Sequence, residues 1–374
     1  MTAFPHEMLR EIYEQPQALN RTLALYLTER GLKQDVRTRL SSWISPSGEI
    51  LVAASGSSRH SGLYGEILLE DLCGLAVDVE YASEYSWRGG PDFINPRNPS
   101  VLVLSQSGET SDTLAALAEA RRQGHKTLAI TNVASSTMAV EADISMPLAA
   151  GVERAIPATK SFTCQLAALY LLALYEGMHL GRLDPEIVNE GIVAIRRVPA
   201  LIETHLDAWR EQAAALAHKY AGAATFLYLG RGIHYAIARE GALKLKESSY
   251  VHAEGYPVGE LKHGPNALVS DRVPLVVIAT VDHGHAASVR RYEKTLQLLE
   301  EMKAQGAKVI AVANAGDERV PVLATDCIAV PPASEYLLPI LEVVPLQLFA
   351  YYMAIEHGVD VDRPRNLSKA VVEK

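Results

Sequence analysis

LAEARRQGHKTLAITN, residues 117–132, is repeated in outline by LLEEMKAQGAKVIAVAN, residues 298–314. Each stretch has an amphipathic helical pattern, a Gln-Gly pair and a basic residue, followed by a short apolar run that ends in Asn. Gly124 and Gly306 stand where a helix that ends in a left-handed residue favours glycine. The repeat predicts two copies of one helix-to-strand unit.

A strand-to-loop element precedes each copy of this unit. The two elements are ILVAASGSSRHSG, residues 50–62, and FLYLGRGIHYAIA, residues 226–238. Strands that alternate with helices of about ten or more residues are typical of parallel sheets covered by helices on both faces. We therefore expect an α/β protein with two tandem doubly wound, flavodoxin-like domains. The expected ranges are a helical lead-in at 1–40, domains at 41–200 and 201–360, and a C-terminal tail at 361–374.

Length and composition limit the class of protein. The chain has 374 residues, 48% of them hydrophobic, which is enough to form two cores. Its formal net charge of −9 argues against a broad basic face, so we expect neither a nucleic acid nor an anionic membrane as a partner. Two apolar stretches, residues 161–175 and 336–355, are too short or too interrupted to span a membrane and predict buried helices.

The two chain features that report on location point to the cytoplasm. The N-terminal residues MTAFPHEMLREIYEQPQ lack the apolar segment of a signal peptide. Cys73, Cys164 and Cys327 lie far apart, so no metal-binding or redox pair of cysteines is indicated and a reducing environment is expected.

Hydroxyl side chains cluster at one strand-to-helix turn, SQSGET at residues 105–110. Ligands of open parallel sheets lie at the carboxyl ends of strands, where helices begin. Ser105, Ser107 and Thr110, with free N–H groups and the positive end of a helix dipole, suit a phosphate. The alternative is that one hydroxyl simply caps the helix. The similar loop at residues 55–62 favours a single polar pocket built from two loops.

Nucleotide-binding motifs are not found in the sequence. No G-x-x-x-x-G-K-[ST] motif occurs, and Tyr235 stands where the dinucleotide fingerprint needs a small residue. The phosphate is therefore expected to belong to a small molecule, and no cofactor is implied.

A second dense region is EGALKLKESSYVHAEGYPVGELKHGP, residues 240–265. Glu240, Lys244 and Glu247 would share one face of a helix. They could form a solvated stripe with an ordinary i,i+4 ion pair. The nearby His263, in a loop flanked by glycine, instead favours a site for proton transfer next to a carbonyl carbon.

A metal site could also be drawn from this region. His252, Glu254 and His263 offer ligands of the right type for zinc. The P-C-x-x-C motif that accompanies such ligands in zinc deaminases does not occur, so no metal is expected.

Several motifs resemble those of the sugar isomerase (SIS) domain family. They are SQSGETSDT at 105–113, the segment at 240–265 and DVDRPRNLSKAVVEK at 360–374, and the lead-in EIYEQP at 11–16 is similar as well. Pairs of SIS domains occur in the isomerase half of glutamine–fructose-6-phosphate aminotransferase and in SIS-type glucosamine-6-phosphate deaminases. The resemblance covers the chain from about residue 7 to its end and implies a phosphosugar enzyme.

The resemblance also implies roles for individual residues. Glu247 matches the base that moves a proton between C1 and C2 of the open-chain sugar, and Lys244 matches its polar partner. His263 matches the residue that opens the sugar ring and reaches the site from a neighbouring subunit, which implies a homodimer with a shared site. Lys369 matches the lysine that forms an imine with the keto sugar. The positions that match phosphate contacts are Ser58, Ser105, Gln106, Ser107 and Thr110.

This chemistry sets requirements for the site. An unperturbed glutamate is a weak base at neutral pH, and an unperturbed lysine is mostly protonated. We therefore expect Glu247 and Lys369 to lie in a closed, partly desolvated pocket, with the polar tail lying over it.

Two departures from the aminotransferase pattern favour a deaminase. Thr2 follows Met1, where that enzyme has the nucleophilic cysteine of a glutaminase domain, so no ammonia from glutamine is expected. Ala158 stands where the synthase pattern has a serine that touches the sugar, and ATKS is closer to the deaminases. The predicted reaction is glucosamine 6-phosphate and water giving fructose 6-phosphate and ammonia.

Other functions remain open from the sequence. The chain could be a synthase that uses free ammonia or a separate glutaminase subunit, a plain aldose–ketose isomerase, or a deaminase for another amino sugar phosphate. A non-catalytic sugar-phosphate sensor is a further alternative, although Glu247, His263 and Lys369 are all present and no helix-turn-helix extension is found.

Overall fold

The chain divides into two compact units in the computed structural model, which describes residues 4–29, 31–88 and 94–369. Neither unit is continuous in sequence, so both the predicted lead-in and the predicted tail are shared between them. The first lobe comprises Gln17–Glu153, Lys160–Arg196 and Ser368–Lys374, and the second lobe comprises Met1–Pro16, Arg154–Thr159 and Arg197–Leu367.

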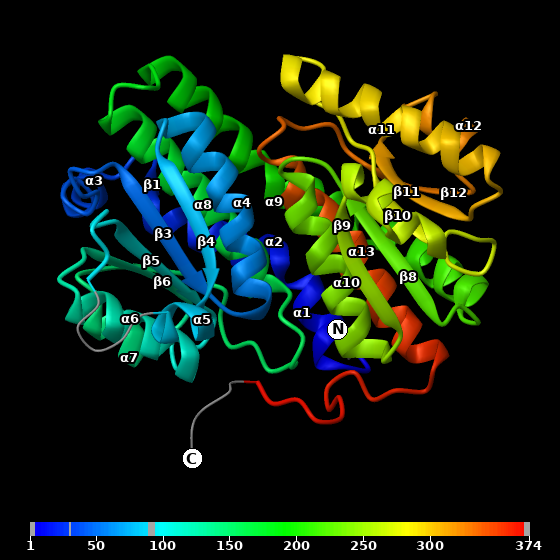
Figure 1. The fold of residues 1–374 in the computed structure, drawn as a ribbon, viewed down its shortest axis with the longest axis horizontal. Coiled ribbons are helices and arrows are strands. Elements are labelled where there is room, and N and C mark those ends of the chain that lie inside the picture. The colour runs from blue at the N-terminus through cyan, green and yellow to red at the C-terminus, as the bar shows by residue number, and fades with distance from the viewer. Residues whose placement is uncertain (1–3, 30, 89–93, 370–374) are drawn as a thin grey trace. The chain divides into compact units, whose positions relative to one another are not determined.

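The first lobe contains a five-stranded sheet in the order β4-β3-β5-β6-β7, and every strand pair in it is parallel (Figure 1). This arrangement confirms the predicted doubly wound fold. All six residues of β5 and all five of β6 are buried, as expected for strands covered on both faces. The strands are β3 (Glu49–Ala54), β4 (Ala76–Tyr81), β5 (Ser100–Ser105), β6 (Thr127–Thr131) and β7 (Ile144–Pro147).

Helices cover both faces of this sheet. Leu51 and Val103 pack with Leu117 of α6 on one face, while Val52 and Leu104 face α4 on the other. Burial of each such Leu or Val contributes about 1.5–3 kcal/mol to folding. The helices are α2 (Gln15–Tyr26), α3 (Gln34–Leu40), α4 (Gly56–Cys73), α5 (Ala82–Trp87), α6 (Ser111–Arg122), α7 (Thr137–Glu141) and α8 (Lys160–His179), and β1 (Leu27–Thr28) pairs with β2 (Gly31–Leu32).

The second lobe repeats this topology. Its parallel sheet has the order β9-β8-β10-β11-β12, so each strand has a counterpart in the first lobe. The long helix α9 (Pro185–Tyr220) begins in the first lobe and ends in the second. The strands are β8 (Thr225–Gly230), β9 (His252–Pro257), β10 (Leu275–Ile278), β11 (Val309–Asn314) and β12 (Asp326–Val330).

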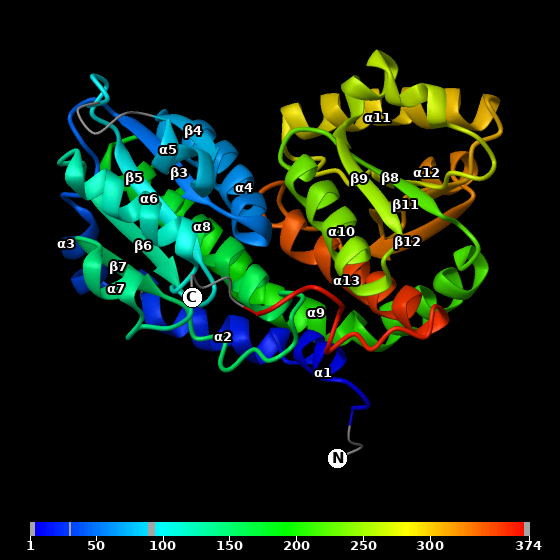
Figure 2. The same ribbon diagram turned by 60° about the horizontal axis from the view of Figure 1, so that its bottom comes forward.

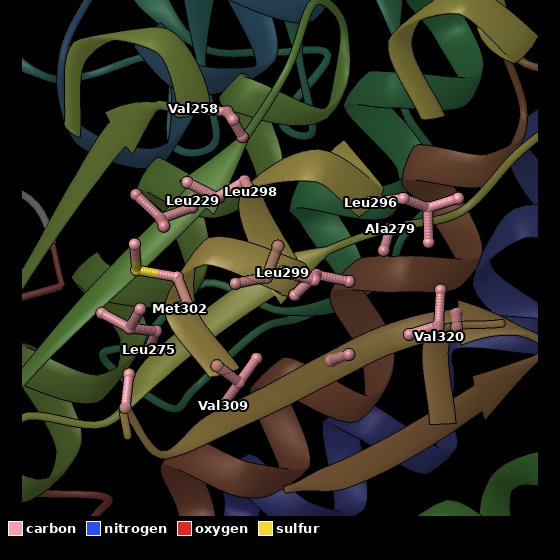
Figure 3. Packing of buried hydrophobic residues seen from close by; sticks show 14 of the residues in the cluster. Leu229, Val258, Leu275, Ala279, Leu296, Leu298, Leu299, Met302, Val309 and Val320 are labelled. Carbon is pink, nitrogen blue, oxygen red and sulfur yellow. The ribbon is translucent and has the colours of Figure 1, made fainter. Parts of the chain in front are cut away.

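Helix α11 lies on the opposite side of this sheet from α13 (Figure 2). On the α11 side, Leu299 and Met302 pack against Leu275 and Val309 of the sheet (Figure 3). The helices are α1 (Glu7–Tyr13), α10 (His234–Ser249), α11 (Ala286–Ala304), α12 (Val320–Leu323) and α13 (Leu338–Glu356), with 3₁₀ turns η1 (Val258–His263) and η2 (Pro265–Leu268).

Two local predictions are confirmed. Gly124 and Gly306 follow the ends of α6 and α11 with φ of 77° and 73°, the left-handed conformation expected there. The two apolar stretches form α8 and α13. Helix α13 is long and apolar enough to cross a membrane, but 89% of its apolar window is buried within the protein, as in a core helix.

Candidate active site

The hydroxyl-rich segments of the first lobe leave the sheet at its topological switch point. From β3 the chain goes outward to β4 on one side, whereas β5 lies on the other side of β3 and leads to β6. Ala54, the last residue of β3, pairs with Leu104 in β5. Since the strands are parallel, the segments that follow them begin side by side at the edge where such sheets bind ligands.

The turn after β5 is built by its own hydroxyls. Ser105 Oγ lies 3.0 Å from Thr110 Oγ1 and accepts the N–H of Gly108 at 3.1 Å. Ser107 Oγ accepts the N–H of Glu109 at 3.1 Å. Thr110 is the N-cap residue of α6, yet its side chain makes no capping hydrogen bond. The simple capping alternative therefore does not describe this turn.

The two remaining predicted phosphate contacts lie on the same edge. Gln106 is half-buried, and its carbonyl oxygen accepts the N–H of Asn132 at 3.1 Å. Ser58, in the first turn of α4, is 9% exposed, and its Oγ accepts a hydrogen bond from Gln165 Nε2 at 2.9 Å. Gln165 also accepts the hydroxyl of Ser61 at 3.0 Å, so α8 fixes the first turn of α4, which carries Ser58. The prediction of a loop at 55–62 is wrong, because only Ser55 separates β3 from α4 and the segment is helical from Gly56 onward.

Three charged residues lie along α10 in the second lobe. Lys244 Nζ is 2.6 Å from Glu247 Oε2 and 3.4 Å from Glu240 Oε1. The side chains of Lys244 and Glu240 are at most 1% exposed, whereas that of Glu247 is 22% exposed. This burial rules out the solvated-stripe alternative.

The charge on Lys244 is maintained by its neighbours. Burial alone would lower the pKa of the ammonium, but the carboxylates of Glu240 and Glu247 outweigh it and raise the pKa above its ordinary value. Lys244 is thus a fixed cation, and Glu247 is the member of the group that solvent, and hence a ligand, can reach.

His263 and Ala158 also belong to the second lobe. His263 ends the 3₁₀ turn η1 with an exposed side chain, and Gly264 follows it with φ of 137°. Ala158 is half-buried in Arg154–Thr159. The candidate residues therefore form one group in the first lobe and one in the second. The first-lobe group is Ser58, Ser105, Gln106, Ser107, Thr110 and Lys369, and the second-lobe group is Ala158, Lys244, Glu247 and His263.

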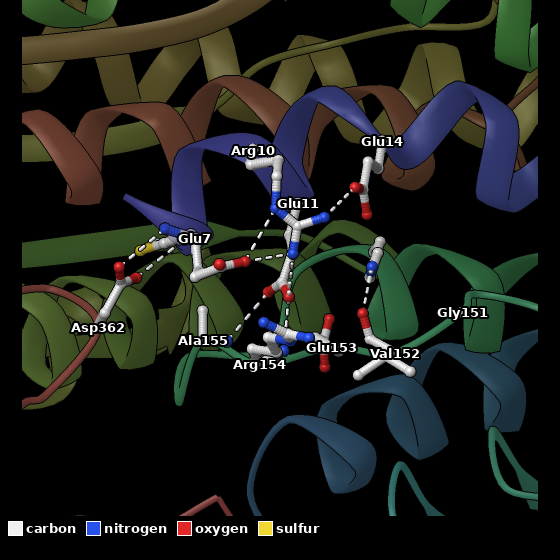
Figure 4. Close-up of polar contacts among 12 residues, drawn as sticks. Glu7, Arg10, Glu11, Glu14, Gly151, Val152, Glu153, Arg154, Ala155 and Asp362 are labelled. Carbon is white, nitrogen blue, oxygen red and sulfur yellow. Dashed lines mark hydrogen bonds and ion pairs between the residues drawn. The ribbon is translucent and has the colours of Figure 1, made fainter. Parts of the chain in front are cut away.

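The segment that carries Ala158 is held by the N-terminal helix α1 (Figure 4). The fully buried carboxylate of Glu11 accepts the backbone N–H groups of Arg154 and Ala155, the latter at 3.2 Å. Asp362 in turn accepts the N–H groups of the first two residues of α1 at 2.8 and 3.0 Å. The EIYEQP motif thus supplies the carboxylate that positions this segment.

Lys369 lies against a buried carboxylate in the first lobe. Its Nζ donates to Glu153 Oε2 at 2.8 Å, and the side chain of Glu153 is fully buried. Glu153 also accepts the N–H and the hydroxyl of Ser161, at 3.1 and 2.6 Å. The lysine is therefore held as an ammonium beside Glu153, and it must give up one proton before it can form an imine.

Comparison with known proteins places the chain in a family. A family model described as SIS domain matches residues 44–175 and 219–357. The chain belongs to the SIS domain family. Over 370 residues it is 44% identical to glutamine–fructose-6-phosphate aminotransferase [isomerizing] from Thermus thermophilus, covering 98% of this chain and 59% of that protein. It is 42% identical to the Aquifex aeolicus protein of the same name, with 98% and 58% covered. This SIS chain spans just under three fifths of the length of these relatives.

Solved structures agree with this assignment. The C-terminal domain of glucosamine-fructose-6-phosphate aminotransferase from Francisella tularensis matches with a TM-score of 0.87 and 33% identity, covering 97% of this SIS chain and 99% of that chain. Glucosamine-6-phosphate deaminase from Thermotoga maritima matches with a TM-score of 0.71 and 23% identity, covering 98% and 100%. At that identity the second likeness concerns the fold alone.

Sequence reasoning missed several residues that shape this SIS site. Glu11, Glu153 and Gln165 were not singled out, although each is buried and holds a predicted site residue or its segment. Their signals in the sequence are weak, because each partner lies about a hundred residues or more away. Of the three, only Glu11 could have been proposed as a residue that shapes the site, because it lies within the highly specific motif EIYEQP.

The second lobe carries a charged network at the equivalent switch point, between β8 and β10. His234, the first residue of α10, lies with Nδ1 2.8 Å from Glu342 and Nε2 3.5 Å from Glu335. Arg291 Nε donates to Glu335 at 3.0 Å, and Thr280 donates to Glu342. In the first lobe this edge of the sheet presents hydroxyl groups. In the second lobe the equivalent edge holds Glu335 and Glu342, which are already paired with cationic side chains of the same chain.

Mutual pairing shifts the pKa values in this network. Burial would lower the pKa of His234, but Glu342 and Glu335 raise it to about 10. Burial would raise the pKa of Glu335, but His234 and Arg291 lower it to about 2.

Among residues 4–29, 31–88 and 94–369, no three His, Cys, Asp or Glu side chains are grouped so as to hold a metal ion.

Proposed function

We propose that this SIS chain interconverts an amino sugar phosphate and a keto sugar phosphate, with glucosamine 6-phosphate and water giving fructose 6-phosphate and ammonia. The observation that carries the proposal is the array on α10, in which the buried Lys244 holds the partly exposed carboxylate of Glu247 at 2.6 Å. A reachable, oriented carboxylate is what a 1,2-proton transfer needs as its base. The named relatives act on fructose 6-phosphate, which supports the substrate class.

The first lobe would bind the phosphate. Ser105, Ser107 and Thr110 hydrogen-bond within the turn rather than capping α6, which leaves the first N–H groups of that helix for a ligand. Neutral donors and a helix dipole suit a phosphate monoester. The nearby Ser58 would add a further hydroxyl.

The proposed reaction proceeds in four stages. His263 helps to open the hemiacetal ring by general acid–base catalysis. Glu247 then removes the proton from C2 and returns one to C1, which converts the C2 amine into a C2 imine. Lys369 then adds to C2 through its amine and the bond between C2 and the sugar nitrogen breaks, so that nitrogen leaves as ammonia and a lysine imine remains. Water adds to C2 of this imine and the Nζ–C2 bond breaks, which forms the carbonyl of fructose 6-phosphate and restores Lys369.

We also propose a cytoplasmic homodimer with shared sites. The proposal is supported by the exposed side chain of His263 at the end of η1, which a neighbouring copy of the chain would use to complete its site. An exposed histidine can complete a site in a neighbouring copy of the chain. It also leaves no buried, unpaired charge in a single chain.

The direction of the reaction is a finer point. Ala158 lacks the sugar-contacting hydroxyl of the synthase pattern, and the ATKS wording is closer to the deaminases, which supports assignment of this chain to the deaminases. Synthesis from free ammonia is a second candidate, because the relatives in two bacteria are named as aminotransferases. A catalyst accelerates both directions, so the two candidates differ in rates and not in equilibrium.

An assay with purified protein tests this proposal. With glucosamine 6-phosphate we expect equal amounts of ammonia and fructose 6-phosphate, measured by NMR and an ammonia assay. Galactosamine 6-phosphate tests the epimer, and fructose 6-phosphate with ammonium tests the reverse reaction. Formation of glucose 6-phosphate without any nitrogen exchange would instead identify a plain isomerase. Tight binding without turnover would identify a sensor and overturn the proposal.

A further inference from the structure

The ion pair between Lys369 and Glu153 has no part in the roles assigned so far. Lys369 lies in the C-terminal tail, 216 residues from Glu153, and its side chain is 25% exposed. Glu153 precedes α8 in the first lobe, and its side chain is inaccessible to solvent. The tail residue with the proposed imine chemistry is thus held by a carboxylate that the protein has buried.

The carboxylate of Glu153 is also held by a residue other than the lysine. Ser161, in the first turn of α8, donates both its N–H and its hydroxyl to this carboxylate. Burial would raise the pKa of Glu153, but Lys369 and Ser161 together hold it below its ordinary value. A buried anion needs a partner, because an uncompensated buried charge is strongly destabilising. Lys369 supplies that partner.

Helix α8 connects this ion pair to the first turn of α4, which carries Ser58. Ser161 and Gln165 are four residues apart, so their side chains lie on one face of the helix. Ser161 holds Glu153, and Gln165 donates to Ser58 at 2.9 Å. The face of α8 that carries Ser161 and Gln165 therefore positions both the first turn of α4, with Ser58, and Lys369 of the tail.

We infer that Glu153 is a positioning residue, which docks Lys369 on the face of α8 that also holds the first turn of α4 with Ser58, and so presents its amine to the keto carbon of the sugar phosphate. This inference rests on the proposed function. In the step concerned, one proton leaves the ammonium and the Nζ–C2 bond forms. The C2–O bond then breaks and oxygen departs as water, so an ammonium and a ketone give a protonated imine and water.

Reductive trapping tests this role. The protein is incubated with fructose 6-phosphate and sodium cyanoborohydride, which adds hydride to the imine carbon but spares the free ketone, and the adduct on Lys369 is quantified by mass spectrometry from pH 6 to pH 9. We expect the wild type to trap and Lys369→Arg to trap nothing. Glu153→Gln should trap at least about 10-fold more slowly at its optimum, because a misplaced reacting group costs factors of this size.

Two comparisons separate positioning from a general loss of structure. Glu153→Asp keeps a carboxylate beside the amine and should restore most of the trapping rate that Glu153→Gln loses. The affinity of Glu153→Gln for sorbitol 6-phosphate, which has no carbonyl group, should stay within about 3-fold of the wild-type affinity if Ser58 and the turn at 105–110 are intact. Ser161→Ala, which removes one hydroxyl donor, should show a milder version of the same defect if Glu153→Gln does not fold.

Three outcomes would overturn the inference or its basis. Trapping by Glu153→Gln at the wild-type rate would show that Glu153 does not position the lysine. Turnover by the wild type with no adduct on Lys369 would also overturn the inference but leave the proposed function standing. Absence of both adduct and turnover in the wild type would overturn the proposed function as well.

Discussion

Lys244 carries a charge in the interior of the second lobe, with a carboxylate on either side of it. Its ammonium is 2.6 Å from Glu247 and 3.4 Å from Glu240, and the pairing keeps its pKa high despite burial. Such an array costs desolvation free energy, and replacement of the whole set by apolar groups would be tolerated better than removal of one member. The proposed use of Glu247 as a base would give this costly array a function.

Lys244→Met should therefore be strongly destabilising. It leaves buried Glu240 without the ammonium, which should lower the free energy of unfolding by about 3–5 kcal/mol in urea denaturation. The double change Glu240→Gln with Lys244→Met should recover most of this loss. Lys246→Met, at an exposed position on the same helix, is the control and should change stability by less than about 0.5 kcal/mol. A Lys244→Met variant as stable as the control would contradict the burial of this charge.

His234 should make the stability of the second lobe depend on alkaline pH. Its pKa is about 10 in the folded protein and about 6.5 in an unfolded chain, so its pairing contributes fully below pH 6.5 and is lost as the pH rises toward 10. The urea midpoint of the wild type should fall between pH 7 and pH 10. His234→Gln should be less stable at pH 7 and should show a smaller change across the same range, and an identical pH slope in both proteins would refute this.

At the scale of single elements, the turn between β5 and α6 is the most constrained part of the first lobe. Gly108 has φ of 70°, and a β-carbon there would lie 2.1 Å from Ser136 Oγ and 2.9 Å from Thr131 Oγ1. The glycine thus permits both the left-handed backbone and the close approach of the next loop.

Gly108→Ala should destabilise the protein and weaken sugar-phosphate binding. The left-handed backbone costs an alanine about 1–2 kcal/mol, and overpacking against Ser136 adds about 1–3 kcal/mol. Gly124→Ala is a matched control, because φ there is 77° but no atom lies within 4 Å of the added β-carbon. Urea denaturation gives the loss in free energy of unfolding for each variant, and the difference between the two losses is the cost of the contact between the added methyl group and Ser136. Equal losses in the two variants would mean that the turn can relax around a methyl group.

Much of each element could be predicted from local pattern. The repeat around Gly124 and Gly306 predicts the helix ends and the strands that follow them, because glycine position and apolar periodicity are local properties. The hydroxyls of 105–110 likewise stand together because they share one turn. The contact between Glu153 and Lys369 could not be foreseen, since it joins residues 216 positions apart through the fold of the whole lobe.

At the scale of the whole molecule, two lobes of the same topology differ at the same place. The first lobe presents hydroxyls between β3 and β5, whereas the second lobe holds Glu335, paired with Arg291 and His234, between β8 and β10. A carboxylate that already neutralises these cations should exclude a phosphate. The sequence repeat predicted two lobes but could not show this difference, because Glu335 lies far from the repeated strand-to-loop element.

We expect one sugar phosphate to bind per chain. Isothermal titration with sorbitol 6-phosphate should give a stoichiometry of one, and Ser105→Ala combined with Thr110→Val should abolish binding. A stoichiometry of two, or binding that survives these changes, would show that the second lobe also accepts phosphate.

Hydrogen exchange at the sugar tests whether Glu247 transfers a proton between C1 and C2. Fructose 6-phosphate is incubated with the protein in D₂O, with and without ammonium, and the C1 protons are followed by NMR. The wild type and Glu293→Gln, a control at an exposed carboxylate on α11, should replace one C1 proton by deuterium, and Glu247→Gln should do so at least about 100-fold more slowly. Sugar-phosphate binding by the wild type without any exchange, or exchange by Glu247→Gln at the wild-type rate, would contradict this account.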